Sequence, residues 1–198
     1  TYIMYPFVKF LEYLTKTIMT LSGGYPHLKP ITEEEINEVV DQGYAEKTLE
    51  KEERDLVHNA LEFDDTSIQN VMTLKDGIFS LDSERKLSEV ISKIKERGFS
   101  RIPIFKKTPE NIVGILHIWD IAKLPEKEYD KTKINAIARK PFFVYSSDKI
   151  SDLLIELKKK DLHMAIVLND AEKLEGVITI EDLVEEIVGD IAGEAKRK

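Results

Sequence analysis

The 198-residue chain contains no cysteine, which excludes disulfide bonds, thiolate catalysis and cysteine-ligated metal sites. It also has no excess of basic residues, because 29 Lys and Arg stand against 37 Asp and Glu, for a formal net charge of −8. A nucleic-acid-binding surface needs clustered positive charge, so this balance argues against a nucleic-acid partner. The absence of cysteine favours a cytosolic setting. Hydrophobic residues make up 42% of the chain, enough to build a core.

Catalytic signatures are also missing from the sequence. It contains no P-loop, no nucleophile-and-base pair and no cluster of metal-ligand residues. We therefore expect no enzyme activity. An enzyme such as a nucleotide hydrolase is the rival hypothesis, and measurable nucleotide turnover would support it.

Residues 1–21 place apolar side chains at helical spacing, but Lys9, Glu12 and Lys16 interrupt them. The segment is therefore too short and too charged to span a bilayer. It predicts either a helix packed on the rest of the protein or on a second copy, or a helix lying at a membrane surface. Because the sequence begins at Thr1, we expect it to be a piece of a longer protein.

Two acidic helices are expected next. Gly and Pro residues break the chain between positions 22 and 30. Thr32 and Glu35 have the spacing of a capping box, which predicts a helix that ends at Gly43. A further helix is expected from Glu50 to Glu62. The acidic residues are typical of helix N-termini and solvated faces, and a regulatory metal-binding role for them is the alternative.

The second half of the sequence contains one pattern twice. Residues 78–121 and 142–183 align with an offset of 62 to 64 positions, and Gly114 to Asp120 matches Gly176 to Asp182. The first copy predicts strands at 78–81, 102–105 and 112–118, with helical segments at 86–97 and 119–122. The second copy predicts strands at 142–145, 164–168 and 176–180, with helices at 150–159 and 181–191. Two such α/β units are expected to bury their open faces against each other and to form two symmetry-related clefts.

The first cleft carries residues suited to a nucleotide. Thr179 and Asp182 lie where a strand gives way to a helix, and a carboxylate beside a hydroxyl suits a ribose diol. Thr179 can equally be a helix cap. Arg101 is the only strong cation in its segment, and its guanidinium is either a phosphate partner or a member of a surface ion pair. Hydroxyls and an apolar wall for a purine come from Thr73, Ser100, Phe99, Ile102 and Pro103.

The second cleft has a poorer set of residues. His117 replaces the threonine, although Asp120 is kept, and Met164 stands where Arg101 stands in the first copy. The expected phosphate cation is therefore missing. We predict one working site per chain and one degenerate site.

The repeat resembles the cystathionine-β-synthase (CBS) domain, in its tandem form known as a Bateman module, over residues 66–190. Val71-Met72-Thr73 and the two Gly-to-Asp stretches carry this resemblance. The chain is also similar to the CorC/cyclin M (CNNM) family of magnesium transporters, over residues 33–36, 52–54, 99–103, 111–116, 163–167 and 177–189. One departure is Leu74, because that family has proline after Met-Thr, and the placement of Thr73 is less fixed without it.

The resemblance implies an α/β (α+β) fold. Juxtamembrane and connecting helices at 1–62 would precede CBS domains at 66–125 and 134–191. In that family the CBS pair follows a DUF21-type membrane domain, so residues 1–21 would be the juxtamembrane end of that domain. The protein would then work at the cytoplasmic face of the cell membrane, regulate transport of magnesium and form a flat, symmetric homodimer through its repeat helices.

The resemblance also implies one adenine nucleotide, ATP or AMP, per chain. Its site would be formed by Thr73, Leu74, Phe99, Arg101, Ile102, Thr179 and Asp182. A nucleotide triphosphate brings about four negative charges to a chain that is already acidic, and one arginine cannot offset them. The chain should therefore prefer AMP or bind ATP with Mg²⁺, and the family resemblance implies the second. The alternatives are a dimerisation module with empty clefts and a CBS regulator of an unrelated partner.

Overall fold

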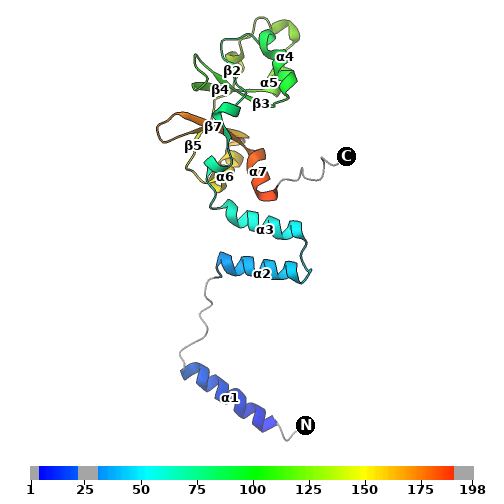
Figure 1. The fold of residues 1–198 in the computed structure, drawn as a ribbon, viewed down its shortest axis with the longest axis vertical. Helices are drawn as coiled ribbons and strands as arrows, with labels where there is room; N and C mark the ends of the chain where they lie inside the picture. The colour runs from blue at the N-terminus through cyan, green and yellow to red at the C-terminus, as the bar shows by residue number, and fades with distance from the viewer. Residues whose placement is uncertain (1–4, 22–30, 190–198) are drawn as a thin grey trace. The chain divides into compact units, whose positions relative to one another are not determined.

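The structure, a computed structural model, describes residues 5–21 and 31–189 (Figure 1). The chain divides into two compact units, residues 1–49 and residues 50–198, which are considered separately. None of the helices within 5–21 and 31–189 combines the length and the apolar character needed to cross a bilayer.

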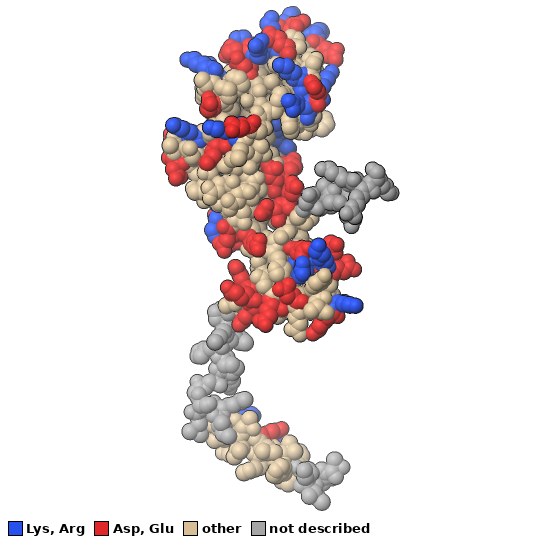
Figure 2. All heavy atoms as spheres, in the orientation of Figure 1, with Lys and Arg blue, Asp and Glu red and all other residues tan. Residues whose placement is uncertain are grey.

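The first unit contains two helices, α1 (Tyr5–Leu21) and α2 (Glu33–Ala45). The helix predicted over residues 1–21 is therefore present from Tyr5. Its surface is mostly uncharged (Figure 2), and the apolar side chains of Phe7, Phe10 and Leu14 are exposed. The break predicted at 22–30 lies outside the described residues.

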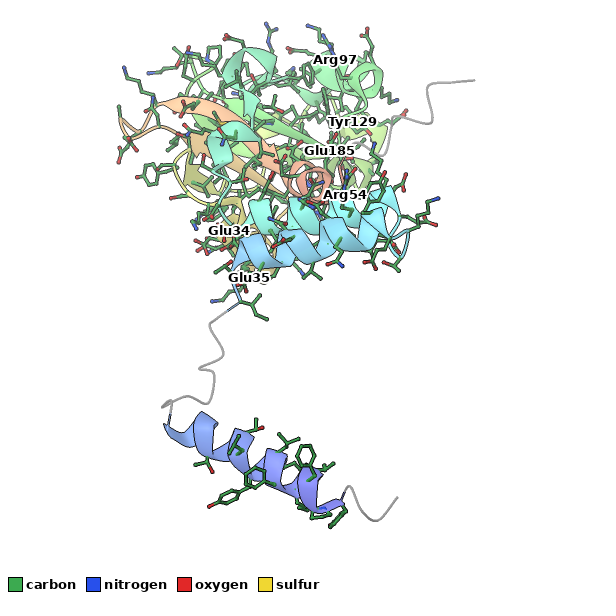
Figure 3. The ribbon with its side chains drawn as sticks, turned by 60° about the horizontal axis from the view of Figure 1, so that its bottom comes forward. Glu34, Glu35, Arg54, Arg97, Tyr129 and Glu185 are labelled. Carbon is green, nitrogen blue, oxygen red and sulfur yellow. The ribbon has the colours of Figure 1, made fainter. Side chains whose placement is uncertain are left out.

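Half of the capping box predicted for α2 is present. The Glu35 N–H donates to Thr32 Oγ1 at 3.3 Å, as expected. In the described structure the return bond from the Glu35 carboxylate is not part of this cap. The neighbouring Glu34 lies at the start of the helix (Figure 3), where hydrogen bonds from its own backbone N–H and from the Thr32 hydroxyl lower the pKa of its carboxyl.

The predicted end of α2 at Gly43 is wrong, because the helix continues to Ala45. The turn is made four residues later by Lys47, whose φ of 58° is left-handed. The N–H groups of Thr48 and Leu49 then fold back onto the Gly43 carbonyl at 2.9 and 3.2 Å. A Cβ at Gly43 would lie 2.9 Å from Leu49 Cδ1, a contact that a shift of the leucine side chain would relieve. The glycine thus gives room for Leu49 where the chain folds back, and it does not end the helix.

The second unit begins with α3 (Lys51–Phe63), one residue later than predicted. The side chain and backbone of Glu50 and Glu53 form a capping box at its N-terminus. At its other end α3 packs on the last helix, α7 (Ile180–Val188), and Asn59 Nδ2 donates to the Ile187 carbonyl at 3.3 Å. The connecting helix is therefore attached to the second copy of the repeat.

Each copy folds into a small sheet with helices, in the predicted order. The sheet of the first copy has strand order β2-β3-β4, and that of the second has the order β1-β7-β6-β5. In both, a parallel pair is followed by an antiparallel pair. The elements are β1 (Thr73–Leu74), β2 (Leu81–Asp82), α4 (Leu87–Arg97), β3 (Arg101–Phe105), β4 (Ile112–His117), α5 (Ile118–Ala122), β5 (Phe143–Tyr145), α6 (Ile150–Lys160), β6 (Met164–Leu168) and β7 (Leu174–Thr179), with short 3₁₀ turns at Ile68–Asn70, Lys75–Gly77, Glu126–Glu128 and Ile134–Ala136.

Two further predicted boundaries are wrong by three residues. The strand expected at 78–81 begins only at Leu81, because a 3₁₀ turn precedes it and Phe79 stacks on Phe99 instead of joining the sheet. The last helix ends at Val188 instead of 191. Gly189, with a φ of 75°, ends that helix, and its N–H donates to the Glu185 carbonyl at 2.8 Å.

The segment that precedes each copy in the sequence, here called its leading segment, joins the sheet of the other copy. β1 precedes the first copy in sequence but pairs antiparallel with β7 of the second, with Thr73 opposite Val177. Arg139 precedes the second copy but bridges to Ile115 of the first, through two N–H···O bonds of 2.9 Å. Each sheet is thus extended by a segment that leads into the other copy.

The repeated glycines make this exchange possible. A Cβ at Gly176 would lie 2.5 Å from the Thr73 carbonyl oxygen, and a Cβ at Gly114 would lie 3.0 Å from Ala138 Cβ. Real Cβ atoms do not approach other atoms so closely without a shift in structure. At Gly176 the backbone oxygen of Thr73 leaves no room for a side chain, whereas at Gly114 a Cβ would be crowded and its neighbours would have to shift.

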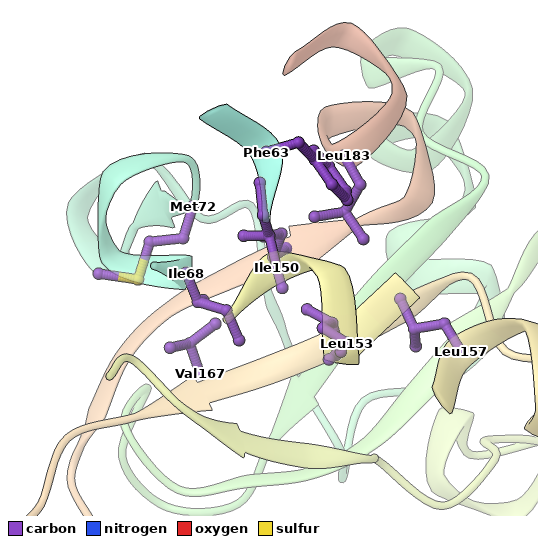
Figure 4. Packing of buried hydrophobic residues seen from close by; sticks show 10 residues of the cluster. Phe63, Ile68, Met72, Ile150, Leu153, Leu157, Val167 and Leu183 are labelled. Atoms are coloured by element: carbon purple, nitrogen blue, oxygen red, sulfur yellow. The ribbon is translucent and has the colours of Figure 1, made fainter. Parts of the chain in front are cut away.

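The core forms three clusters of buried side chains, one for each copy and one that both share. Figure 4 shows the cluster of the second copy, where Ile68 and Met72 from the leading segment pack with Ile150 and Leu153 of α6. The shared cluster consists of Ile112, Ile115, Met164, Ile166, Leu174 and Val177. The predicted burial of one open face against the other is confirmed.

Candidate functional site

A pocket of about 500 Å³ lies between the two copies at the first cleft. Its volume falls within the usual range for small-molecule sites. Both copies and the leading segment contribute to its lining, which consists of Thr73, Gly77, Ile78, Phe79, Gly98, Phe99, Ser100, Arg101, Pro103, Met164, Val177, Thr179, Glu181 and Asp182.

A hydroxyl and a carboxylate stand at the start of α7. Thr179 donates to Asp182 Oδ2 from its N–H and from its Oγ1, both at 2.8 Å, and the Asp182 N–H donates to Thr179 Oγ1 at 3.3 Å. This is a capping box, so the structural alternative predicted for Thr179 is present. Both bonds fall on Oδ2, and among the described residues no donor contacts Oδ1 of Asp182. That oxygen is available to a ligand at the pocket wall.

Arg101 supplies positive charge from the opposite side of the pocket. Its Nη1 lies 3.2 Å from Glu181 Oε1, so an ion pair links β3 of the first copy with α7 of the second. The arginine side chain is 18% exposed and the glutamate 64% exposed. Within the described residues, Glu181 is the only side chain that hydrogen-bonds Arg101. The remaining N–H groups of the guanidinium therefore stay available for an anion.

An aromatic wall completes the pocket. The rings of Phe79 and Phe99 stack with centroids 5.9 Å apart and an interplanar angle of 28°. The guanidinium carbon of Arg97, at the end of α4 (Figure 3), lies 5.6 Å from the Phe79 centroid. Such a surface suits a flat, apolar ring system.

Seven of the nine residues predicted for the site line this pocket: Thr73, Phe99, Ser100, Arg101, Pro103, Thr179 and Asp182. The other two, Ile102 and Leu74, do not. Side chains alternate along a strand, so Arg101 and Pro103 face the pocket while Ile102, 2% exposed, packs in the core of the first copy. Leu74 follows Thr73 in β1 in the same way, and its side chain is exposed.

Seven pocket residues were not predicted from the sequence, and three of them, Phe79, Met164 and Glu181, bear on its chemistry. Met164 is paired with Thr179 in the register of β6 and β7, which alignment of the antiparallel strands would have indicated. Glu181 lies between the two predicted residues of the α7 cap, and its separation from Arg101 by 80 positions conceals the pair. Phe79 was assigned to a strand and was not considered for the pocket.

The second cleft contains an arginine that the sequence did not reveal. Arg139 donates to both oxygens of Asp120, from Nε to Oδ2 at 2.7 Å and from Nη2 to Oδ1 at 3.0 Å. Lys123 Nζ also lies 3.4 Å from Oδ1. The hydrogen bond from Arg139 is the main cause that lowers the pKa of the Asp120 carboxyl. Met164 stands in this cleft at the position of Arg101, as the sequence indicated, but Arg139 supplies a different cation.

His117 has a structural role at the same place. Its Nδ1 accepts the Trp119 N–H at 3.1 Å and so caps α5. Burial, followed by the charges of Arg139 and Arg101, lowers the pKa of the imidazole. No group of three or more His, Asp or Glu side chains suited to a metal ion occurs in residues 5–21 and 31–189.

The sequence profile of the CBS domain matches residues 68–127 and 134–189 of this chain. Among curated proteins, a putative DUF21 domain-containing chloroplastic protein of Arabidopsis thaliana is 32% identical over 99% of this chain and 30% of its own length. The UPF0053 protein YugS of Bacillus subtilis is 30% identical over 97% of this chain and 45% of its own length. The chain thus spans less than half of each of these two relatives.

Solved structures give the same result. The CBS domain of a bacterial CNNM/CorC family Mg²⁺ transporter superposes with a TM-score of 0.76 at 28% identity, over 81% of this chain and 98% of that one. A second structure of a bacterial CNNM/CorC CBS domain, in complex with ATP, superposes with a TM-score of 0.68 at 29% identity, over 70% and 99%. The predicted CBS pair and its resemblance to the CorC/CNNM module are confirmed.

Proposed function

Because this chain belongs to the CBS domain family, we propose that its first cleft binds an adenine nucleotide and regulates a CorC/CNNM-like magnesium transporter. The observation that carries the proposal is a pocket between the two copies that brings together a guanidinium, an available carboxylate oxygen and an aromatic wall. The CNNM/CorC relative solved with ATP supports the choice of ligand.

Each part of the pocket suits one part of a nucleotide. The rings of Phe79 and Phe99 offer a face for the purine. Oδ1 of Asp182 accepts hydrogen bonds from a ribose diol, while Thr179 holds the carboxylate in place through Oδ2. Arg101 donates to phosphate oxygens. Thr73 and Ser100 provide further hydroxyls at the pocket wall.

Glu181 makes the site dependent on a cation. When Arg101 turns to a phosphate, it leaves the Glu181 carboxylate next to a second anion, which is unfavourable. Acidic side chains also gather over α7 (Figure 2), and the chain carries a net charge of −8. Mg²⁺ is held by one or two carboxylates together with phosphates and water, and Glu181 is the pocket residue placed to share it. We therefore expect ATP to bind with Mg²⁺.

The binding signal has a direct route to the connecting helices. Thr179 and Asp182 begin α7, and the other end of α7 packs on α3. A nucleotide that favours one position of α7 therefore shifts the position of α3 as well. Residues 1–62 would transmit this shift to a DUF21-type membrane domain at the cytoplasmic face of the membrane. The CBS domains at 66–125 and 134–191 would form a homodimer without enzyme activity.

Calorimetric titration of ATP, with and without Mg²⁺, tests this function. We expect saturable binding near one per chain that requires Mg²⁺, is weakened about 10- to 100-fold in Arg101→Ala and is lost in Thr179→Ile. Lys93→Ala, a change to an exposed lysine on α4, is the matched control and should bind as the wild type does. Absence of binding in the wild type under both conditions would reject the proposal and favour a dimerisation module with empty clefts.

A further inference from the structure

The register of the exchanged segments defines equivalent positions in the two clefts. Thr73 is paired with Val177, and Arg139 is paired with Ile115. Val177 and Ile115 each follow the repeated glycine of their copy. Arg139 is therefore the counterpart of Thr73, the hydroxyl residue that lines the first pocket.

The remaining positions can be paired in the same way. Met164 is the counterpart of Arg101, and His117 is the counterpart of Thr179. Only the carboxylate is common to both clefts, as Asp182 in the first and Asp120 in the second. The cation of the first cleft is thus Arg101 in β3, whereas the cation of the second cleft is Arg139, in the segment that precedes the second copy.

This change of position alters what the cation contacts. Arg101 pairs with Glu181 and makes no bond to Asp182. Arg139 instead binds both oxygens of Asp120, at 2.7 and 3.0 Å. Its backbone is fixed by the two bonds of 2.9 Å to Ile115, so the guanidinium is attached to a rigid support. The Asp120 side chain is only 19% exposed.

We propose that Arg139 blocks the second cleft. Its guanidinium binds the Asp120 carboxylate that a ligand would otherwise use, and this restricts the nucleotide to the first cleft. The inference rests on the proposed function of the first cleft for the identity of the excluded ligand. A bidentate guanidinium–carboxylate pair is charge-assisted and geometrically specific. A ribose diol can bind Asp120 only by displacing this pair, and the Arg139 guanidinium, 56% exposed, would then turn to water or to the phosphates of the ligand. Arg139 is thus a specificity-determining residue that acts by occupying Asp120.

Two variants of the second cleft test the role of Arg139. His117→Thr gives it the hydroxyl of the first cleft but retains Arg139, and it leaves untouched Met164, which lines the first pocket. The double variant His117→Thr/Arg139→Thr also has threonine, the residue found at the equivalent position 73, and keeps Lys123 as a cation 3.4 Å from Asp120. Titration with Mg²⁺ and ATP should give one nucleotide per chain in the wild type and in His117→Thr, and a second, weaker binding event in the double variant. Two nucleotides per chain in His117→Thr, or only one in the double variant, would overturn the inference.

A thermal denaturation cycle without nucleotide tests the contact independently of the proposed function. Arg139→Thr, Asp120→Asn and the combined variant are compared with the wild type. We expect each single change to lower the Tm, and the combined change to lower it no further than the larger single effect, because both remove one interaction. Lys123→Ala is the control, since this lysine is 75% exposed and should have little effect. Additive losses of Tm would contradict the inferred interaction between Arg139 and Asp120.

If the wild type binds no nucleotide while the cycle is non-additive, the proposed function fails and the Arg139–Asp120 contact stands. If the wild type binds one nucleotide while the losses of Tm in the cycle are additive, the proposed function stands and the inferred role of Arg139 fails. The two results therefore separate the inference from the function on which it rests.

Discussion

The first and second clefts are built on the same backbone positions, but their cations serve different purposes. Arg101 extends across the pocket to an exposed glutamate and keeps most of its donors available. Arg139 is bound to Asp120 through two short contacts. A duplicated fold can thus keep one site open and close the other by moving one arginine. The difference shows that the number of charges in a cleft matters less than which groups they contact.

The largest expected effect concerns the repeated glycines that admit the exchanged segments. Gly176→Ala should reduce the free energy of unfolding by roughly 3 kcal/mol, because its Cβ would meet the backbone oxygen of Thr73 at 2.5 Å. Gly114→Ala should cost less, about 1 kcal/mol, because the contact with Ala138 Cβ is longer, at 3.0 Å, and the Ile104 side chain at 3.1 Å can shift. Urea denaturation measures both values. Equal losses of unfolding free energy in the two variants would show that a Cβ is no more crowded at position 176 than at position 114.

The next effect concerns the cation of the first cleft. Arg101→Ala should weaken Mg²⁺·ATP binding by about 10- to 100-fold, as expected for a lost charge-assisted hydrogen bond to phosphate. Arg139→Ala should leave the affinity of the first cleft unchanged, since its guanidinium is bound to Asp120. Calorimetry on the two variants measures the contrast. A similar loss in both would show that Arg139 also serves the first cleft.

A smaller effect is expected for the glutamate that pairs with Arg101. Glu181→Gln keeps the shape of the side chain and removes the negative charge that would face a phosphate. We expect it to improve binding of ATP without Mg²⁺ several-fold and to reduce the advantage that Mg²⁺ gives. Glu186→Gln, an exposed change on the same helix, is the control. An unchanged dependence on Mg²⁺ in Glu181→Gln would exclude this residue as its cause.

The smallest expected effect concerns the pH dependence of the second cleft. Burial, Arg139, Arg101 and His163 lower the pKa of His117, and Asp120 opposes them. The unfolded chain therefore takes up this proton more readily than the folded protein does. The contribution of His117 to stability is present above about pH 6.5 and is lost as the pH falls through the lower folded-state pKa. Protonation of Nδ1 also breaks the bond from Trp119.

Thermal denaturation at pH 7 and pH 5 measures this contribution. The fall in Tm between the two values should be smaller in His117→Gln than in the wild type. A fall in His117→Gln as large as that of the wild type would show that other groups account for the acid sensitivity.

The sequence was sufficient to predict the parts of the molecule that repeat with a constant spacing. The pairing of Arg101 with Met164 and of Thr179 with His117 followed from an offset of 62 to 64 residues. Arg139 stands 66 residues after Thr73, outside that offset, because the leading segment of the second copy is shorter. Its role depends on strand pairing across the two copies, which no local pattern indicates.

The placement of site residues differs from the prediction for a similar reason. Ile102 was included as part of an apolar wall with Phe99 and Pro103 and by the family resemblance, whereas strand alternation places its side chain in the core. The Arg101–Glu181 pair joins positions 80 residues apart, and only the packed fold brings them together. At Gly43, the glycine suggested a helix end, but its lack of a Cβ serves the packing of Leu49.

The exchange of leading segments also determines how the module can be divided. β1 completes the sheet of the second copy, and the residues around Arg139 complete that of the first. A peptide ending at residue 127 would contain β1 without the sheet of the second copy that β1 joins. A peptide beginning at residue 128 would contain Arg139 without the sheet of the first copy that it joins. The two fragments are therefore complementary, and expressed together they should assemble into a heterodimer that neither forms alone.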